Sequence, residues 1–146
     1  DKGIPVILTQ ILALPAREDE PYDTAYSTAA KLHEAGVDFC IAGSANSFSA
    51  ANARNLPYQA GMAAAFGLAK EEALRAVTLY PARILGIGNE LGSIEAGKSA
   101  SLITTDGDPL EIRTTVERAF TDGREADLST RHTRLYERYS ARPTLD

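Results

Sequence analysis

A short loop of small and polar residues follows one of the most apolar stretches of the chain, and it holds the first candidates for a functional site. The apolar stretch covers residues 37–42, and Ser44 and Asn46 come shortly after it. The loop partly matches a nucleophile elbow, but the second glycine of Gly-x-Ser-x-Gly is missing and no histidine stands beside it. We therefore predict that Ser44 lines a pocket or stabilises a turn, with Asn46 as a second pocket residue.

Arg54 is the third candidate, because it follows the same loop in the segment Arg-Asn-Leu-Pro-Tyr. A guanidinium group binds anionic ligands well, so Arg54 could face such a ligand at the mouth of the pocket. The alternative, which we weight more strongly, is an ion pair that fixes the loop.

The residues that commonly bind metals or form disulfides are few and isolated. His33 falls in a predicted helix and His132 in a basic tail, and neither has a second ligand at metal-binding spacing. We expect surface or capping roles for both, and we predict no metal site in this chain. The single cysteine, Cys40, lies in an apolar run, so we expect a buried, unreactive thiol and no internal disulfide.

Composition excludes several classes of protein. The hydrophobic fraction of 44% and the charged fraction of 24% are typical of a globular domain. A net charge of -5 gives no sign of the basic face that nucleic-acid binding requires. No apolar run approaches the ~18 residues of a membrane span.

The chain enters an apolar segment almost at once and has no initial Met, so we expect it to begin within a structural unit.

The first part of the chain is predicted to fold as a β/α unit. Apolar runs at residues 4–8 and 37–42 predict two strands, and residues 22–34 between them have helical periodicity. Asp23 is a plausible N-cap for that helix, and Gly36 suits its end. This order favours parallel strands. Further helices are predicted at residues 56–66, 70–77 and 81–85.

After residue 86 the pattern changes to short strands separated by turns. Asp122-Gly123 is a strong hairpin signal, and Gly97 marks another turn. Residues 128–139 predict a basic surface helix or an extended strap. Strands are predicted at residues 91–94, 100–105 and 116–121, and the domain boundaries are 1–86, 87–127 and 128–146.

Three segments together resemble the amidohydrolase superfamily, and in particular its imidazolonepropionase-like members. They are GLAKEEALRAVT at 67–78, PARILG at 81–86 and LGSIEAGKSASL at 91–102, with DGDPL at 106–110 and TDGR at 121–124 in support. The resemblance covers nearly the whole chain. It implies an α/β fold made of the terminal strands and helices of a (β/α)8 barrel, plus part of the C-terminal β-sandwich.

The resemblance also implies a reaction, namely metal-dependent hydrolysis of C–N bonds other than peptide bonds. In this superfamily the last barrel strand ends in an aspartate that binds a divalent metal, usually zinc, and takes a proton from water. Ser44 occupies that position here, and a shift of one residue would place Ala45 there instead. We therefore expect impaired catalysis. The alternative is a non-catalytic scaffold or assembly subunit that partners an active amidohydrolase.

Two parallel strands cannot close a barrel, and their edges would expose unpaired backbone groups. We expect the remainder of the barrel to come from a missing N-terminal segment or from another chain, and we expect a homo-oligomer. Helices of this chain are expected to cover one side of the two strands and to leave the other open. No nucleic-acid partner is expected.

Overall fold

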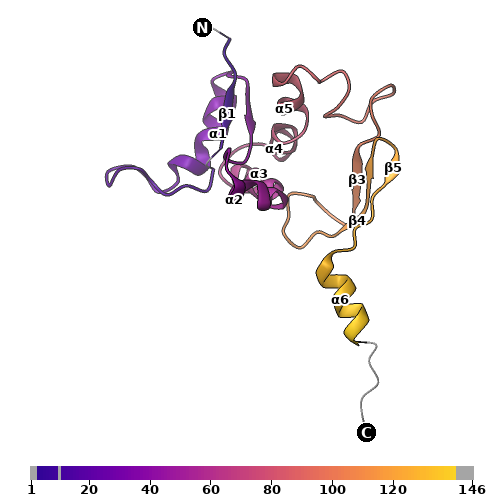
Figure 1. The fold of residues 1–146 in the computed structure, drawn as a ribbon. Helices are drawn as coiled ribbons and strands as arrows, with labels where there is room; N and C mark the ends of the chain where they lie inside the picture. The colour runs from indigo at the N-terminus through magenta and orange to yellow at the C-terminus, as the bar shows by residue number, and fades with distance from the viewer. Residues whose placement is uncertain (1–2, 10, 141–146) are drawn as a thin grey trace.

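The computed structural model describes residues 3–9 and 11–140, and Figure 1 shows how they are arranged. Two small sheets are separated by a group of helices, and one further helix extends away from the body. In chain order the described elements are β1 (Val6–Leu8), α1 (Thr24–Glu34), β2 (Phe39–Ile41), α2 (Ser47–Ala51), the 3₁₀ turn η1 (Ala53–Asn55), α3 (Leu56–Ala65), α4 (Lys70–Ala76), α5 (Leu79–Ile84), β3 (Leu102–Thr105), β4 (Val116–Thr121), β5 (Arg124–Glu125) and α6 (Arg131–Ser140).

The predicted β/α unit forms, with β1 and β2 paired in parallel and α1 connecting them. Gly36 ends the helical segment with φ +67°, a left-handed conformation that glycine adopts at little cost. Asp23 stands at the start of α1, but its side chain makes no capping hydrogen bond. Asp23 is thus the N-cap residue, as predicted, but it caps α1 without a side-chain hydrogen bond. The neighbouring Thr24 hydroxyl donates to the Pro21 carbonyl at 2.8 Å.

β2 is the most deeply buried strand. The side chains of Phe39 and Ile41 on one face and of Cys40 on the other are 1–3% exposed. The strand contacts α1, α3, α4 and α5. The expectation of an open side is wrong for β2, because the chain itself covers both faces. It holds better for β1, where Ile7 is 52% exposed. Alanines that are completely buried bring the helices close to one another: Ala29, Ala60, Ala63, Ala73 and Ala76.

The second sheet is antiparallel, in the order β3-β4-β5. Asp122 and Gly123 connect β4 to β5 with φ angles of +51° and +76°. Two successive positive φ angles are the geometry of a tight hairpin turn, so the predicted hairpin forms.

The predicted strand at residues 91–94 does not form, and this segment is a bend. Gly92 has φ +93°, and a side chain there would come within 2.7 Å of the Ala82 side chain and 2.9 Å of the Leu79 Cα. The backbone of this segment therefore packs directly on α5, where no strand is available to pair with it.

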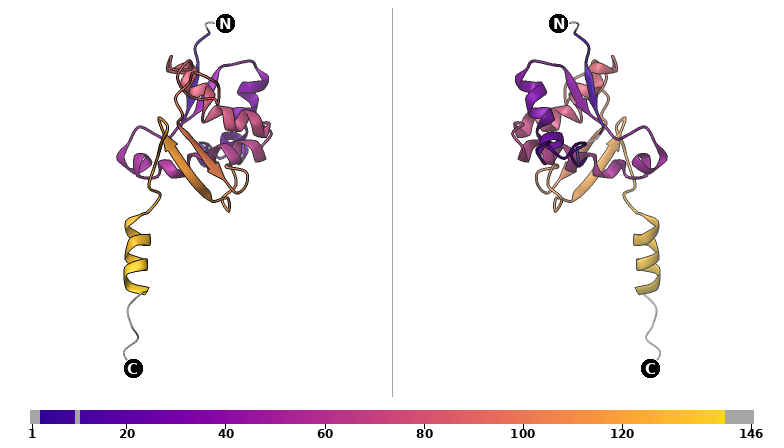
Figure 2. Two further views of the ribbon diagram at one scale, coloured as in Figure 1. Left: turned by 90° about the vertical axis from the view of Figure 1, so that its right-hand side faces the viewer. Right: turned by 90° about the vertical axis from the view of Figure 1, so that its left-hand side faces the viewer.

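The basic tail forms α6, which projects from the body in both views of Figure 2. Every residue of this helix is exposed. Residues 141–146 of the predicted tail lie outside the described part of the chain. In the part that is described, no helix has the length and apolar character needed to cross a membrane.

Candidate functional site

The carboxyl ends of β1 and β2 lie side by side, because the two strands are parallel neighbours. The Ser44 hydroxyl donates a hydrogen bond of 3.2 Å to the carbonyl of Thr9, which follows β1. The Ser44 carbonyl in turn accepts a 2.8 Å bond from the Asn46 amide. The Ser44 hydroxyl therefore links the ends of the two strands.

Asn46 positions the short helix α2. Its backbone is extended, and its Oδ1 accepts a 2.8 Å hydrogen bond from the Ser49 amide. This is the standard way in which an asparagine N-cap satisfies one of the free amides of a first helical turn. The helix that it starts carries Phe48, whose side chain is 79% exposed.

A cavity of about 760 Å³ lies at these strand ends. Ser44 and Asn46 both line it, whereas Arg54 does not and is exposed. Sequence reasoning did not identify Asn55 and Gln59, which also line the cavity. Their spacing of four residues, one helical turn, was the available signal. Other lining residues include Thr9, Leu12, Ser47, Phe48, Asn52 and Leu56.

This arrangement can bind and orient a ligand, but it offers little for catalysis. The Ser44 hydroxyl donates to a backbone carbonyl, and none of the described residues that line the cavity is a histidine or carboxylate that could act as its base. Across residues 3–9 and 11–140, no group of three or more His, Cys, Asp and Glu side chains could hold a metal ion.

Cys40, Arg54 and the two histidines contribute nothing to this cavity. Cys40 is buried, and burial raises the pKa of its thiol, which favours the unreactive protonated form. His132 lies on exposed α6. His33 belongs to a separate polar cluster, described next.

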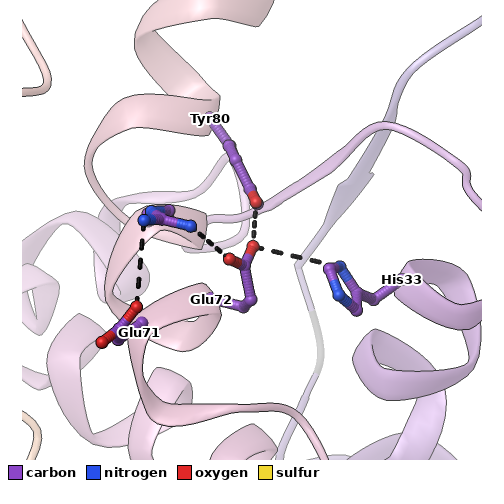
Figure 3. Close-up of polar contacts among 5 residues, drawn as sticks. His33, Glu71, Glu72 and Tyr80 are labelled. Atoms are coloured by element: carbon purple, nitrogen blue, oxygen red, sulfur yellow. Dashed lines mark hydrogen bonds and ion pairs between the residues drawn. The ribbon is translucent and has the colours of Figure 1, made fainter.

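Glu72 on α4 is the centre of that cluster (Figure 3). Its carboxylate accepts hydrogen bonds from the Tyr80 hydroxyl and the Arg75 guanidinium, and His33 Nδ1 lies 4.0 Å from it. Only 15% of the Glu72 side chain is exposed. Three helices, α1, α4 and α5, therefore converge on one carboxylate.

The cluster lies toward the amino end of β2, away from Ser44. The Tyr80 ring packs edge-on against Phe39, the first residue of that strand, with centroids 6.0 Å apart. The Tyr80 hydroxyl is the main cause that lowers the pKa of Glu72, and Arg75 adds to it, while partial burial acts in the opposite direction. Burial, followed by the Glu72 carboxylate, raises the pKa of Tyr80. Such paired contacts hold helices together, and we assign the cluster a structural role.

The sequence profile of the amidohydrolase family matches residues 12–128. This range includes all the helices from α1 to α5, the antiparallel sheet β3–β5 and the whole 43–59 region of the cavity. The chain therefore belongs to the amidohydrolase family. The resemblance noted in the sequence is thereby confirmed.

Two proteins illustrate the relationship. An imidazolonepropionase from Syntrophobacter fumaroxidans is 36% identical over 83 residues, which are 56% of this chain and 19% of that protein. An amidohydrolase structure from Thermotoga maritima MSB8 is 30% identical, with a TM-score of 0.73 over 86% of this chain and 32% of that one. This chain therefore spans about a third or less of the proteins it resembles.

An adenosine deaminase from Xanthomonas campestris with bound zinc shares the fold alone. It is 24% identical, with a TM-score of 0.52 over 77% of this chain and 32% of that chain. These likenesses support a mixed α/β fold of the amidohydrolase kind.

Proposed function

We propose that this chain is the C-terminal portion of an amidohydrolase-like protein and forms one wall of its substrate pocket. In this proposal β1, α1 and β2 are terminal units of a (β/α)8 barrel, and β3–β5 belong to its β-sandwich. The parallel pairing of β1 and β2 around a helical connection supports the barrel assignment. The antiparallel sheet that follows α5 supports the assignment of the sandwich strands.

The proposed site is the cavity at the carboxyl ends of β1 and β2, where barrel enzymes place their functional groups. The family reaction would be hydrolysis of a C–N bond outside a peptide. The residues of this chain would contribute binding and orientation through Ser44 and Asn46.

Metal-dependent hydrolysis is proposed to be impaired. A catalytic divalent metal is bound mainly by carboxylate, imidazole and thiolate groups. The described residues around this cavity offer neutral hydroxyl and amide groups only, so they do not fit such a metal. The observation that carries the proposal is the hydrogen bond from the Ser44 hydroxyl to the Thr9 carbonyl. It supports the proposal because the resemblance places the metal-binding aspartate at Ser44, and this neutral side chain already has a backbone partner.

Metal content and turnover test this proposal. The purified chain is measured by elemental analysis and assayed on amides and lactams with and without added zinc, beside the variants Ser44→Asp and Ser47→Asp. Ser47 lines the same cavity but lies on α2, so it is a matched control. We expect no stoichiometric zinc and no turnover in any of the three proteins, because one carboxylate does not complete a metal site. Near-stoichiometric zinc with metal-dependent turnover in the unmodified chain would refute impaired catalysis.

A second candidate function is a scaffold or assembly subunit for an active amidohydrolase. The observation in its favour is the exposure of β1 and of the segment before it: Ile7 in β1 is 52% exposed, and Ile4, which precedes the strand, is 68% exposed. An apolar strand at a sheet edge is a natural surface for pairing with another chain. Co-purification with an active amidohydrolase, with no activity of this chain alone, would favour this function over the first.

A further inference from the structure

Helix α6 is amphipathic, and yet every one of its residues is exposed. The spacing of one helical turn brings its large apolar and aromatic side chains to one face, and these are 36%, 75% and 53% exposed in the order Leu135, Tyr136 and Tyr139. The same spacing forms a stripe of arginines along one edge of this apolar face, namely Arg131, Arg134 and Arg138. An apolar helix face of this kind is normally packed against another surface.

α6 carries a charge opposite to that of the rest of the chain. Its three arginines outnumber its single acidic residue, Glu137, whereas the whole chain has a net charge of -5. Residues 126–130, which lead to the helix, have no regular secondary structure, and α6 projects from the body in both views of Figure 2. A projecting basic helix is attracted to an acidic surface.

The same chain has a groove between β1 and α1 that suits such a helix. Its volume is about 420 Å³. Apolar residues of β1, of α1 and of the segment between them form most of its wall, and two of these, Ile7 and Leu14, are 52% and 82% exposed. Glu20 also lines the groove. Because every residue of α6 is exposed, α6 does not fill the groove of its own chain.

The loop beside the groove, residues 16–23, is acidic. Arg17 and Asp19 neutralise each other through an ion pair of 2.6 Å. The other carboxylates of this loop make no ion pair with any residue that the structure describes, and they belong to Glu18, Glu20 and Asp23. The groove and its loop therefore offer apolar contact and negative charge side by side. These are the two properties that complement the apolar face and the arginine stripe of α6.

We propose that α6 of one copy of this chain docks in the groove of a second copy, which returns its own α6 to the first. The helix and the groove belong to the same chain and match in both charge and polarity, so a second copy supplies the complementary surface. The exchange is two-fold symmetric, and each contact occurs twice. In each contact the arginine stripe faces the acidic loop and the apolar face covers Ile7 and Leu14. This inference goes beyond the proposed function and does not depend on it.

Charge reversal followed by mixing tests the proposal. One variant carries Arg131→Glu and Arg134→Glu in the first turn of α6, where acidic side chains suit the helix dipole. The other carries Glu18→Arg and Glu20→Arg. Each variant alone brings like charges face to face, so its dissociation constant for self-association should rise at least about tenfold. An equimolar mixture should regain association to within about threefold of the unmodified chain, because each reversed element then meets an opposite charge.

Sedimentation equilibrium measures these dissociation constants, and circular dichroism checks that each variant is folded. The matched control carries Arg113→Glu and Arg124→Glu, which change the net charge as the α6 variant does. Both of these residues are exposed and lie outside α6 and the groove. The control should associate as the unmodified chain does.

Paramagnetic labelling locates the contact. A nitroxide is attached at Glu137→Cys, on the side of α6 away from the apolar face, while the buried Cys40 is protected from the label. The labelled chain is mixed with an unmodified, ¹⁵N-labelled chain. We expect the amide signals of residues 14–23 and of the first turns of α1 to broaden, and those of β3–β5 to keep their intensity.

Every other outcome overturns the proposal. A chain that is monomeric at micromolar concentration would leave the groove to another part of the barrel or to a different protein. A dimer whose broadened signals lie elsewhere, or a mixture that does not regain association, would exclude this contact. Binding of a monomer to phosphatidylserine vesicles, lost in the α6 variant, would assign the helix to an anionic membrane instead. None of these measurements involves zinc or turnover.

Discussion

Gly61 on α3 lies directly against the backbone of Leu110, in the segment between β3 and β4. A Cβ atom at position 61 would be 2.7 Å from the Leu110 carbonyl oxygen. Leu110 is 8% exposed and belongs to the core formed by the helices. This close approach, together with the 3.1 Å ion pair between Lys70 and Asp108, holds the antiparallel sheet region against the helices.

Gly61→Ala should therefore destabilise the chain, although alanine is normally the better helix residue. Helix propensity alone would stabilise the variant by about 1 kcal/mol. The clash with backbone should outweigh this and give a net loss of about 1–3 kcal/mol. Urea unfolding followed by circular dichroism measures the change. Ala65→Gly, at an exposed position of the same helix, is the control and should lose only about 1 kcal/mol. A more stable Gly61→Ala variant would show that the contact is absent.

Tyr80→Phe should destabilise the chain by removing the main hydrogen bond to Glu72 while keeping the ring packed on Phe39. Hydrogen bonds to charged groups contribute about 1.5–3 kcal/mol. The loss is measured as the difference in free energy of unfolding between the two proteins near pH 7. Tyr58→Phe is the matched control and should change stability by less than about 0.5 kcal/mol.

The effect of Tyr80→Phe should also depend on pH. The folded-state pKa of Glu72 is lowered from its ordinary value of 4.5. The stabilisation is therefore fully present above pH 4.5 and declines as the pH falls below that value through the folded-state pKa. The stability difference between the unmodified chain and Tyr80→Phe should shrink over this acidic range. A difference that stays constant below pH 4.5 would contradict the assigned ionisation.

Asn46→Ala and Asp23→Ala should differ, although both residues precede helices. Asn46 caps α2 through Oδ1, whereas Asp23 makes no capping bond to α1. The asparagine variant should lose about 1 kcal/mol, and the aspartate variant should lose less than half of that. Hydrogen exchange at the Ser49 amide provides a local measurement and should accelerate only in Asn46→Ala. Equal losses in both variants would show that the side-chain cap does not matter.

The chain should associate through its exposed β1 strand. Ile7 is 52% exposed at a strand whose outer edge has no partner strand among the described residues. Light scattering coupled to size-exclusion chromatography should show an oligomer at micromolar concentration. Ile7→Lys should favour the monomer, because charge on an edge strand opposes pairing. Ile103→Lys, at a position 50% exposed on β3, is the control. This prediction would be contradicted if the unmodified chain were a monomer that unfolds cooperatively.

Local patterns predicted the elements whose signals lie within a few residues. The apolar runs and the helix between them predicted β1, α1 and β2, and Gly36 marked the end of the first helix. Asp122-Gly123 also predicted the turn between β4 and β5, because the tendency to adopt a positive φ depends mainly on the residue type itself. The segments at residues 67–78, 81–86 and 91–102 identified the family, because a family is recognised by the order and spacing of such motifs along the chain.

Tertiary structure decided what depends on distant contacts. The strand predicted at residues 91–94 failed because α5 packs on Gly92, and no local pattern reports that contact. Arg54 and Gln59 are both polar residues near the same loop, yet only Gln59 lines the cavity. The direction in which each side chain points depends on how η1 and α3 pack. The partners of Glu72 come from three helices that only folding brings together, so the chemistry of that carboxylate is a property of the packed chain.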